Sequence, residues 1–155
     1  MQDRPNSLPL PPIFLVAMVA LCYLLDTFLP IGWDPERVTP LMRWGGGLLI
    51  AIAIALDVWT FATLRRHRTT IRPDRGANAL AKDGPFAFSR NPIYLGNVLI
   101  VSGLGFVLGS RWFIFGAVAL YVLLLEFAIK REEEHLAKRF GADWRAYASR
   151  VRRWI

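Results

Sequence analysis

Residues 93–129, IYLGNVLIVSGLGFVLGSRWFIFGAVALYVLLLEFAI, decide the fold. They hold two apolar runs, 93–108 and 112–129, which are separated only by a short turn that begins at Gly109. Each run is close to the roughly 17 to 25 residues that a membrane-spanning helix requires, although the first is marginal. So short a connection predicts an antiparallel hairpin, and the outer ends of its two helices must then be neighbours.

Two further apolar runs, 13–29 and 48–64, precede this hairpin. With 54% hydrophobic and 20% charged residues, the 155-residue chain is too apolar for an ordinary soluble domain. The sequence therefore predicts one all-α, polytopic membrane domain over residues 1–155, with four transmembrane helices. A secretory signal peptide is not expected, because a proline-rich head precedes the first run and three more apolar runs follow it.

The formal charge of +7 is concentrated in two segments of the chain. Most of the 19 lysines and arginines lie between residues 65 and 90 or after residue 129. The positive-inside rule assigns both segments and both termini to the cytoplasm, and four spans give the parity that this requires. We expect an integral protein of the bacterial inner (cytoplasmic) membrane, and we interpret the charge as topology and lipid attraction, not as nucleic-acid binding.

The chain has few cysteine and histidine side chains that could bind a metal ion. Cys22 is the only cysteine, and His67 and His135 are the two histidines. Neither a disulfide framework nor a zinc site is expected from so small a set, and no metal is predicted. The sequence leaves the oligomeric state open.

The last apolar run is predicted to continue into the cytoplasm as a helical tail, because no helix breaker occurs before Gly141, which we expect to cap the helix. This tail carries Glu132 and Glu133. Composition alone favours a solvated, charge-laced surface for such carboxylates. Glu126 precedes Glu133 by seven residues and should share nearly the same helical face. Asp57, inside the second run, is expected to find a polar partner within the bundle.

The segment before the hairpin forms a helix start. Asn91 is expected to be the N-cap and Pro92 the first helical residue. A helix N-terminus beside Arg90 attracts anionic groups. The hairpin brings this start to the same side of the membrane as Glu132 and Glu133. Opposite charges would then line one pocket, which suits a zwitterionic ligand.

Three motifs occur in a fixed order across residues 76–155. They are Gly84-Pro85-Phe86, then Arg90-Asn91-Pro92-x-Tyr94-Leu95-Gly96, then Glu132-Glu133-x-x-Leu136-x-x-x-Phe140-Gly141-x-x-Trp144-x-x-Tyr147 with Val151-Arg152-Arg153. This combination resembles the isoprenylcysteine carboxyl methyltransferase and phospholipid methyltransferase superfamily of integral membrane enzymes. The chain departs from it at Asn91, where the best-known members have histidine; asparagine can hydrogen-bond a cofactor but cannot shuttle a proton.

The resemblance implies S-adenosylmethionine as cofactor, held on the cytoplasmic side by residues 76–155 without a GxGxxG loop. It implies two catalytic residues, Arg90 and Glu133. The cofactor-binding residues that it implies are Gly84, Arg90, Asn91, Pro92, Tyr94, Glu132 and Glu133.

The methyl acceptor is expected to be lipophilic and to enter from the bilayer. An isoprenylcysteine-like carboxylate is already ionised at neutral pH, and an arginine such as Arg90, Arg150 or Arg153 need only orient it. A phospholipid amine must first lose a proton, which makes Glu133 a candidate base. Charge types alone do not decide between these two acceptors.

Two other functions remain open. A non-catalytic membrane scaffold or lipid-binding protein would use Glu132 and Glu133 as a solvated face and Asn91 only as a cap. A sterol-reductase-like enzyme that uses NADPH is less favoured, because the chain is short. Thermal stabilisation by S-adenosylmethionine or by a nicotinamide cofactor would separate the three functions.

Overall fold

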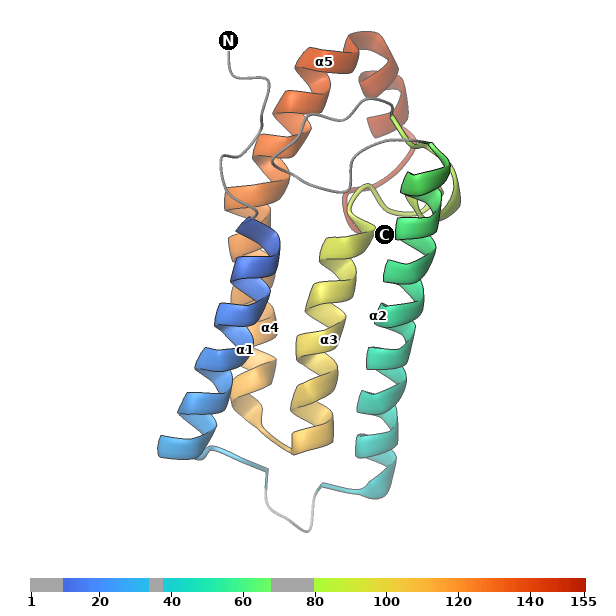
Figure 1. Cartoon of the computed structure of the whole chain (residues 1–155). Coiled ribbons are helices and arrows are strands. Elements are labelled where there is room, and N and C mark those ends of the chain that lie inside the picture. The colour runs from blue at the N-terminus through green and yellow to red at the C-terminus, as the bar shows by residue number, and fades with distance from the viewer. Residues whose placement is uncertain (1–9, 34–37, 68–79) are drawn as a thin grey trace.

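Helices form the described part of the chain, which comprises residues 10–33, 38–67 and 80–155 of a computed structural model. The elements are α1 (Leu10–Phe28), α2 (Pro40–Arg66), the 3-10 turn η1 (Gly84–Ala87), α3 (Pro92–Leu108), α4 (Arg111–Leu124), the π-helical turn η2 (Leu125–Ile129) and α5 (Lys130–Ala148). In Figure 1, α2 packs along α3, α3 along α4, and α4 along α1. The predicted all-α class is confirmed for these residues.

Among the described residues, three helical segments are long and apolar enough to cross a membrane: Pro11–Phe28, Pro40–Arg66 and Arg111–Ala148. The third segment combines α4, η2 and α5 into one rod. The helix α3 is apolar but shorter, with 17 residues. These segments indicate an integral membrane protein, while the fourth predicted span, 93–108, corresponds to the shorter α3.

The helix α2 extends beyond the predicted run 48–64 at both ends. Thr39 caps its start, because the Thr39 side chain accepts a hydrogen bond from the Met42 backbone N–H at 3.3 Å, and Pro40 occupies the first turn. The three glycines at residues 45–47, which precede the predicted run, therefore lie inside the helix.

One of these glycines brings α2 close to α3. A Cβ atom at Gly46 would lie only 2.6 Å from the Gly103 carbonyl oxygen, and one at Gly103 would lie 2.7 Å from the Gly46 carbonyl oxygen. The two glycines therefore let α2 and α3 approach closely, and the spacing of glycines within one helix does not identify such a pair.

The predicted hairpin between α3 and α4 is confirmed. Gly109 ends α3 in the left-handed conformation with φ 69°, a backbone geometry that glycine adopts without a steric penalty. The segment after α1 is joined to this turn by a hydrogen bond from the Trp33 N–H to the Gly109 carbonyl at 3.1 Å. The starts of α1 and α3 and the end of α2 consequently lie at the opposite end of the bundle, as Figure 1 shows.

The π turn changes which side chains share a face of the long rod. Such a turn inserts extra backbone into a helix and shifts the register of everything after it. Glu126 is accordingly exposed and pairs with Lys130, whose Nζ lies 2.7 Å from Glu126 Oε2. Glu133 is far less exposed than Glu126, and it bonds to Arg153 and Arg90 instead of to Lys130.

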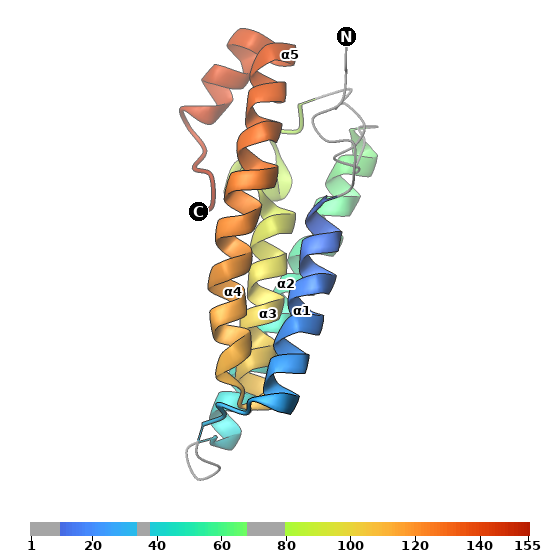
Figure 2. The same ribbon diagram turned by 90° about the vertical axis from the view of Figure 1, so that its left-hand side faces the viewer.

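Gly141 bends the rod but does not end it. The residue has φ 51° and ψ −114°, and helical turns resume after it to Ala148. Figure 2 shows α5 rising beyond the bundle and folding over at its tip. Gly141 is therefore a hinge between two helical pieces, because its open surroundings and missing side chain permit the positive φ.

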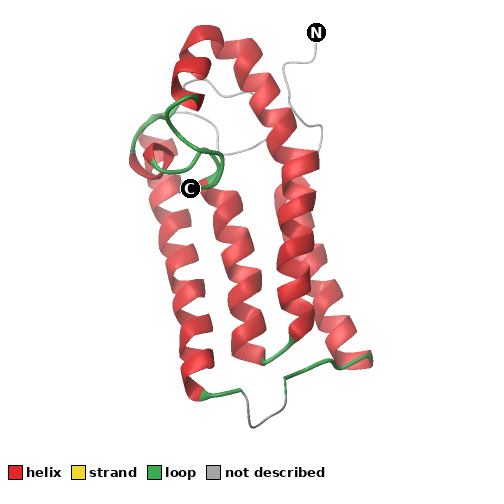
Figure 3. Cartoon of the chain, turned by 180° about the vertical axis from the view of Figure 1, so that it is seen from behind, coloured by secondary structure: helices red, strands yellow, loops and turns green. Residues whose placement is uncertain are grey.

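The chain end returns to the start of α3. The Arg90 N–H donates to the Arg152 carbonyl at 3.0 Å, and Figure 3 shows the two green loop segments together at this end of the bundle. Other parts of the sequence prediction, including residues 1–9 of the proline-rich head and Arg68, Arg72 and Arg75, lie outside the described residues.

Candidate functional site

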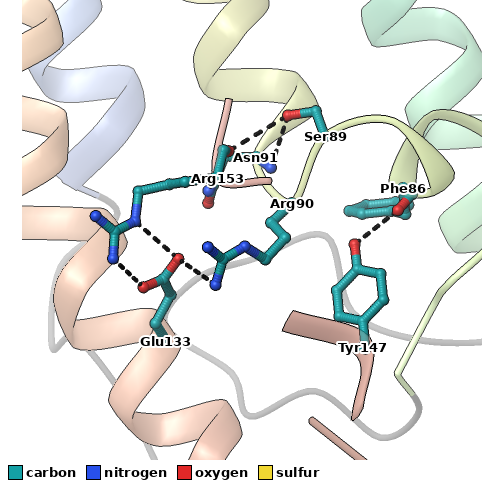
Figure 4. Close-up of polar contacts among 7 residues, drawn as sticks. All are labelled: Phe86, Ser89, Arg90, Asn91, Glu133, Tyr147 and Arg153. Carbon is teal, nitrogen blue, oxygen red and sulfur yellow. Dashed lines mark hydrogen bonds and ion pairs between the residues drawn. The ribbon is translucent and has the colours of Figure 1, made fainter. Parts of the chain in front are cut away.

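Opposite charges meet where α3 begins and α5 begins. Glu133 accepts two hydrogen bonds from Arg153, from Nε to Oε1 at 3.0 Å and from Nη2 to Oε2 at 2.7 Å. Arg90 Nη1 lies 3.2 Å from the same Oε1, as drawn in Figure 4. The Glu133 side chain is only 14% exposed. A solvated charged surface does not describe Glu133, and its carboxylate raises the pKa of the Arg153 guanidinium by hydrogen bonding.

Arg90 also contacts an aromatic side chain of α5. Its guanidinium lies 5.9 Å from the centroid of the Trp144 ring, a cation–π distance. Its Nε is buried and finds no hydrogen-bond partner among the described residues. The bend at Gly141 brings Trp144 to Arg90. It also lets the Tyr147 hydroxyl donate to the Phe86 carbonyl at 2.7 Å (Figure 4).

Tyr94 and Glu132 form a second pair beside the first. The Tyr94 hydroxyl donates to Glu132 Oε2 at 2.8 Å, and Tyr94 is buried. Glu132 follows the apolar run 112–129.

Asn91 occupies the N-cap position of α3, but its side chain makes no capping hydrogen bond. Its Nδ2 instead donates to the Arg153 carbonyl at 2.9 Å, and the Ser89 hydroxyl approaches the same carbonyl at 3.5 Å (Figure 4). The predicted N-cap position of Asn91 is confirmed, but the cap has no side-chain hydrogen bond. The amide group is instead bonded through its N–H to a carbonyl from the far end of the chain.

The remaining candidates are backbone positions. Pro92 begins α3 as predicted and is buried. Gly84 has φ 58° and begins η1, where a Cβ atom would lie 2.7 Å from Thr63 Oγ1 in α2. Gly84 thus packs the loop against α2. The structure brings Arg90 together with Glu133, and Tyr94 together with Glu132.

Two residues of the C-terminal segment make contacts that the sequence did not predict, and the first of them belongs to this site. Arg153 was considered only as a residue that could orient an acceptor, yet it makes the shortest hydrogen bond to Glu133. Trp154 stacks on Tyr121 of α4 with ring centroids 4.6 Å apart, and its buried Nε1 has no hydrogen-bond partner in the described segments. The Val151-Arg152-Arg153 motif was the available signal for this segment.

Two further observations concern candidate ligands. Within residues 10–33, 38–67 and 80–155, no group of three or more His, Cys, Asp or Glu residues is placed to hold a metal ion.

Asp57 was expected to have a polar partner, but its Oδ1 is buried and accepts no hydrogen bond from any described residue.

Comparisons with known proteins cover this part of the chain. A model of the phospholipid methyltransferase family matches residues 41–143. The cobalt-zinc-cadmium resistance protein CzcN of Cupriavidus metallidurans is 26% identical over 119 residues, which are 77% of this chain and 51% of CzcN, so the chain spans about half of that relative. An uncharacterized protein of Haemophilus influenzae is 33% identical over 63 residues, 41% of this chain and 100% of that protein. No solved structure matches the chain.

Proposed function

The chain belongs to the phospholipid methyltransferase family, and on this premise we propose that it transfers a methyl group from S-adenosylmethionine to a lipophilic acceptor at the membrane face where α3 and α5 begin. The family match makes it a membrane methyltransferase in general terms. The cofactor, the acceptor and the assignment of residues are our proposal.

The charge cluster around Glu133 carries this proposal. The amino-acid end of S-adenosylmethionine has a carboxylate and an ammonium group, so it needs donors and acceptors side by side. Arg90 offers a buried Nε without a partner in the described part of the chain, and Glu133 offers a carboxylate 3.2 Å from the same guanidinium. The donor set therefore fits the cofactor.

Other residues complete the proposed cofactor site. Glu132 is a second carboxylate for the ammonium group, and the hydroxyl of Tyr94 holds it in place. Trp154 Nε1 is a second buried donor with no acceptor in the chain segments described. Asn91 and Pro92 hold the backbone of the helix start beside Arg90.

The cofactor would supply an electrophilic methyl group on a sulfonium. The protein then has to hold the acceptor atom in line, roughly 3 to 3.5 Å from the methyl carbon, and to exclude water. Arg90 and Arg153 already fix Glu133 from two sides, so these charges need little reorganisation when a ligand binds. Trp144 contributes aromatic surface beside Arg90.

We further propose that α3 crosses the membrane as the fourth span, because α4 pairs with it along the hairpin. Both termini and the charge cluster would then lie in the cytoplasm of a bacterium, and the protein in the inner membrane. The basic residues near the end of α2 and in α5 support this orientation.

Methyl-labelled S-adenosylmethionine tests the proposal directly. Membranes that contain the protein should transfer label into the lipid fraction, whereas membranes without it should not. Calorimetry on detergent-purified protein should detect S-adenosylhomocysteine with a Kd of about 1 to 100 μM. A well-folded protein that binds no S-adenosylhomocysteine and transfers no label would overturn the proposal and favour the membrane scaffold.

A further inference from the structure

Residues 149–155 follow the end of α5 without regular helix, and we call them the C-terminal strap. The strap lies against the two residues that precede α3. The Arg90 backbone N–H donates to the Arg152 carbonyl at 3.0 Å, and Asn91 Nδ2 donates to the Arg153 carbonyl at 2.9 Å. Two consecutive residues before α3 therefore hold two consecutive carbonyls of the strap.

Arg153 is fixed at both of its ends. Its carbonyl accepts the hydrogen bond from Asn91, and its guanidinium donates to both carboxylate oxygens of Glu133, at 3.0 and 2.7 Å. Because the carbonyl and the side chain belong to one residue, a hydrogen bond to the carbonyl restricts where the guanidinium can lie. A long side chain loses rotamer freedom in a bidentate pair, so an anchored backbone favours the pair.

These contacts close a circuit of residues, which Figure 4 shows. Arg90 is the chain neighbour of Asn91, and its Nη1 lies 3.2 Å from the Glu133 oxygen that also accepts from Arg153 Nε. Asn91 thus closes the circuit from the backbone side. A change at Asn91 removes a restraint on Arg153 and leaves both guanidinium groups and the carboxylate chemically intact.

The Asn91 amide has one orientation that fits this contact. Its nitrogen can donate to a carbonyl, whereas its oxygen would be repelled by one. Asn91 is only 7% exposed, and its side chain does not cap α3. The side-chain N–H that the resemblance would offer to a cofactor therefore serves the strap.

We propose that Asn91 is a positioning residue that acts through Arg153. By holding the Arg153 carbonyl, Asn91 keeps the guanidinium on Glu133 in the arrangement that receives the amino-acid end of the ligand. The inference rests on the proposed function where it concerns that ligand, whereas the position of the strap is a property of the chain alone. Direct contact between Asn91 and the ligand is the alternative that the experiments must separate from it.

A double-mutant cycle separates the two possibilities by calorimetry with S-adenosylhomocysteine. Asn91→Ala should weaken binding about 3- to 10-fold, because one positioning hydrogen bond is lost. In the Arg153→Ala background the same change should weaken binding no more than about twofold, since no guanidinium remains to be positioned. A loss by the same factor in both backgrounds would show that Asn91 acts independently of Arg153 and would overturn the proposal.

Two further variants guard this cycle. Asn97→Ala removes another buried amide, roughly 9 Å further along α3, and should leave the affinity unchanged in both backgrounds. Should Asn91→Ala fold poorly, Asn91→Ser replaces it in every measurement. Serine suits the start of a helix, but its side chain is too short to reach the Arg153 carbonyl.

Steady-state kinetics distinguish positioning from a structural defect. A partly unfolded variant contains fewer active molecules, so its apparent kcat falls and its KM does not change. Asn91→Ala should instead raise the KM for S-adenosylmethionine about 3- to 10-fold and keep kcat within about twofold of the wild type. A lower kcat at an unaltered KM would overturn the positioning role.

Hydrogen exchange without ligand tests the strap independently of the cofactor. The Arg90 amide hydrogen is covered by the Arg152 carbonyl, so its exchange reports whether the strap is in place. Asn91→Ala should speed exchange in the peptide that contains Arg90 at least about threefold, and Asn97→Ala should not. Unchanged exchange in Asn91→Ala would overturn the inference. Faster exchange in a protein that never binds S-adenosylhomocysteine would refute the proposed methyl donor and leave the action of Asn91 on the strap standing.

Discussion

The two ends of the helical bundle differ in how their buried polar groups are satisfied. Where α3 turns into α4, the buried Ser110 hydroxyl donates to Asp26 Oδ1 at 2.6 Å. At the opposite end, Arg90 Nε and Trp154 Nε1 are buried without a hydrogen-bond partner among the described residues. An unsatisfied buried donor costs free energy, so we interpret the second end as built for a group that the described residues do not supply.

This difference separates stability from binding. Substitutions at the hairpin end should change the free energy of unfolding and leave ligand affinity intact. Substitutions at the charged end should change ligand affinity more than they change stability. Each prediction below would either sharpen this contrast or break it.

The largest effect is expected from Glu133→Ala at the charged end. Removal of this carboxylate leaves Arg90 and Arg153 facing each other and takes away an acceptor for the ligand's ammonium. The affinity for S-adenosylhomocysteine, measured by calorimetry, should fall at least about 100-fold. Glu134→Ala is the control, because the neighbouring Glu134 is exposed. Similar affinities for the two variants would contradict the assignment of Glu133 to the site.

At the hairpin end, Ser110→Ala removes a hydrogen bond to a carboxylate. The free energy of unfolding in detergent should fall by about 1.5 to 3 kcal/mol, the usual worth of a hydrogen bond to a charged group. The Kd for S-adenosylhomocysteine should not change. Ser149→Ala serves as the comparison, since the Ser149 hydroxyl is exposed and bonds only to the nearby Ala146 carbonyl. A weakened ligand in Ser110→Ala would break the contrast between the two ends.

A smaller effect is expected at Trp154. Trp154→Phe preserves an aromatic ring for the stack on Tyr121 but removes the buried N–H donor. Without ligand the variant should melt at the same temperature as the wild type or higher, because no hydrogen bond within the described chain is lost. Its affinity for S-adenosylhomocysteine should fall about 3- to 10-fold. Trp44→Phe, at an exposed position of α2, should change neither quantity.

The parts of the site that sequence could predict depend on local rules. The short turn at Gly109 fixes the α3–α4 hairpin, and Pro92 fixes where α3 begins. These two features are sufficient to bring Arg90 and Glu133 to the same end of the bundle. The contact between their side chains, at 3.2 Å, agrees with that prediction.

The parts that sequence could not predict depend on long-range contacts. A π turn has no propensity signal of its own, so a regular 3.6-residue pattern could not predict the turn at Leu125–Ile129. Glycine commonly ends a helix, so the sequence does not predict a second helical piece after Gly141. That piece carries Trp144, which packs on Arg90. Asparagine is a common N-cap residue, but the Asn91 side chain donates to the carbonyl of Arg153, which lies 62 positions away in the sequence.

The smallest effect is expected for a pair of side chains at the charged end that already bond to each other. His67 Nε2 and Asp83 Oδ1 are 2.6 Å apart on the surface. The hydrogen bond from His67 holds the pKa of Asp83 below its ordinary value of 3.8. Since the pKa is lower in the folded state, the pair stabilises the protein above pH 3.8, and the stabilisation is lost as the pH falls through the folded value.

Asp83→Asn should therefore lower the melting temperature slightly at pH 6, and the difference from the wild type should shrink as the pH falls below 3.8. Affinity for S-adenosylhomocysteine should stay the same, because neither residue holds a buried atom that lacks a partner. A melting difference that persists at low pH would show that packing, not the charge of Asp83, is responsible. Loss of ligand affinity would show that position in the bundle, and not an unsatisfied buried group, identifies a binding residue in this protein.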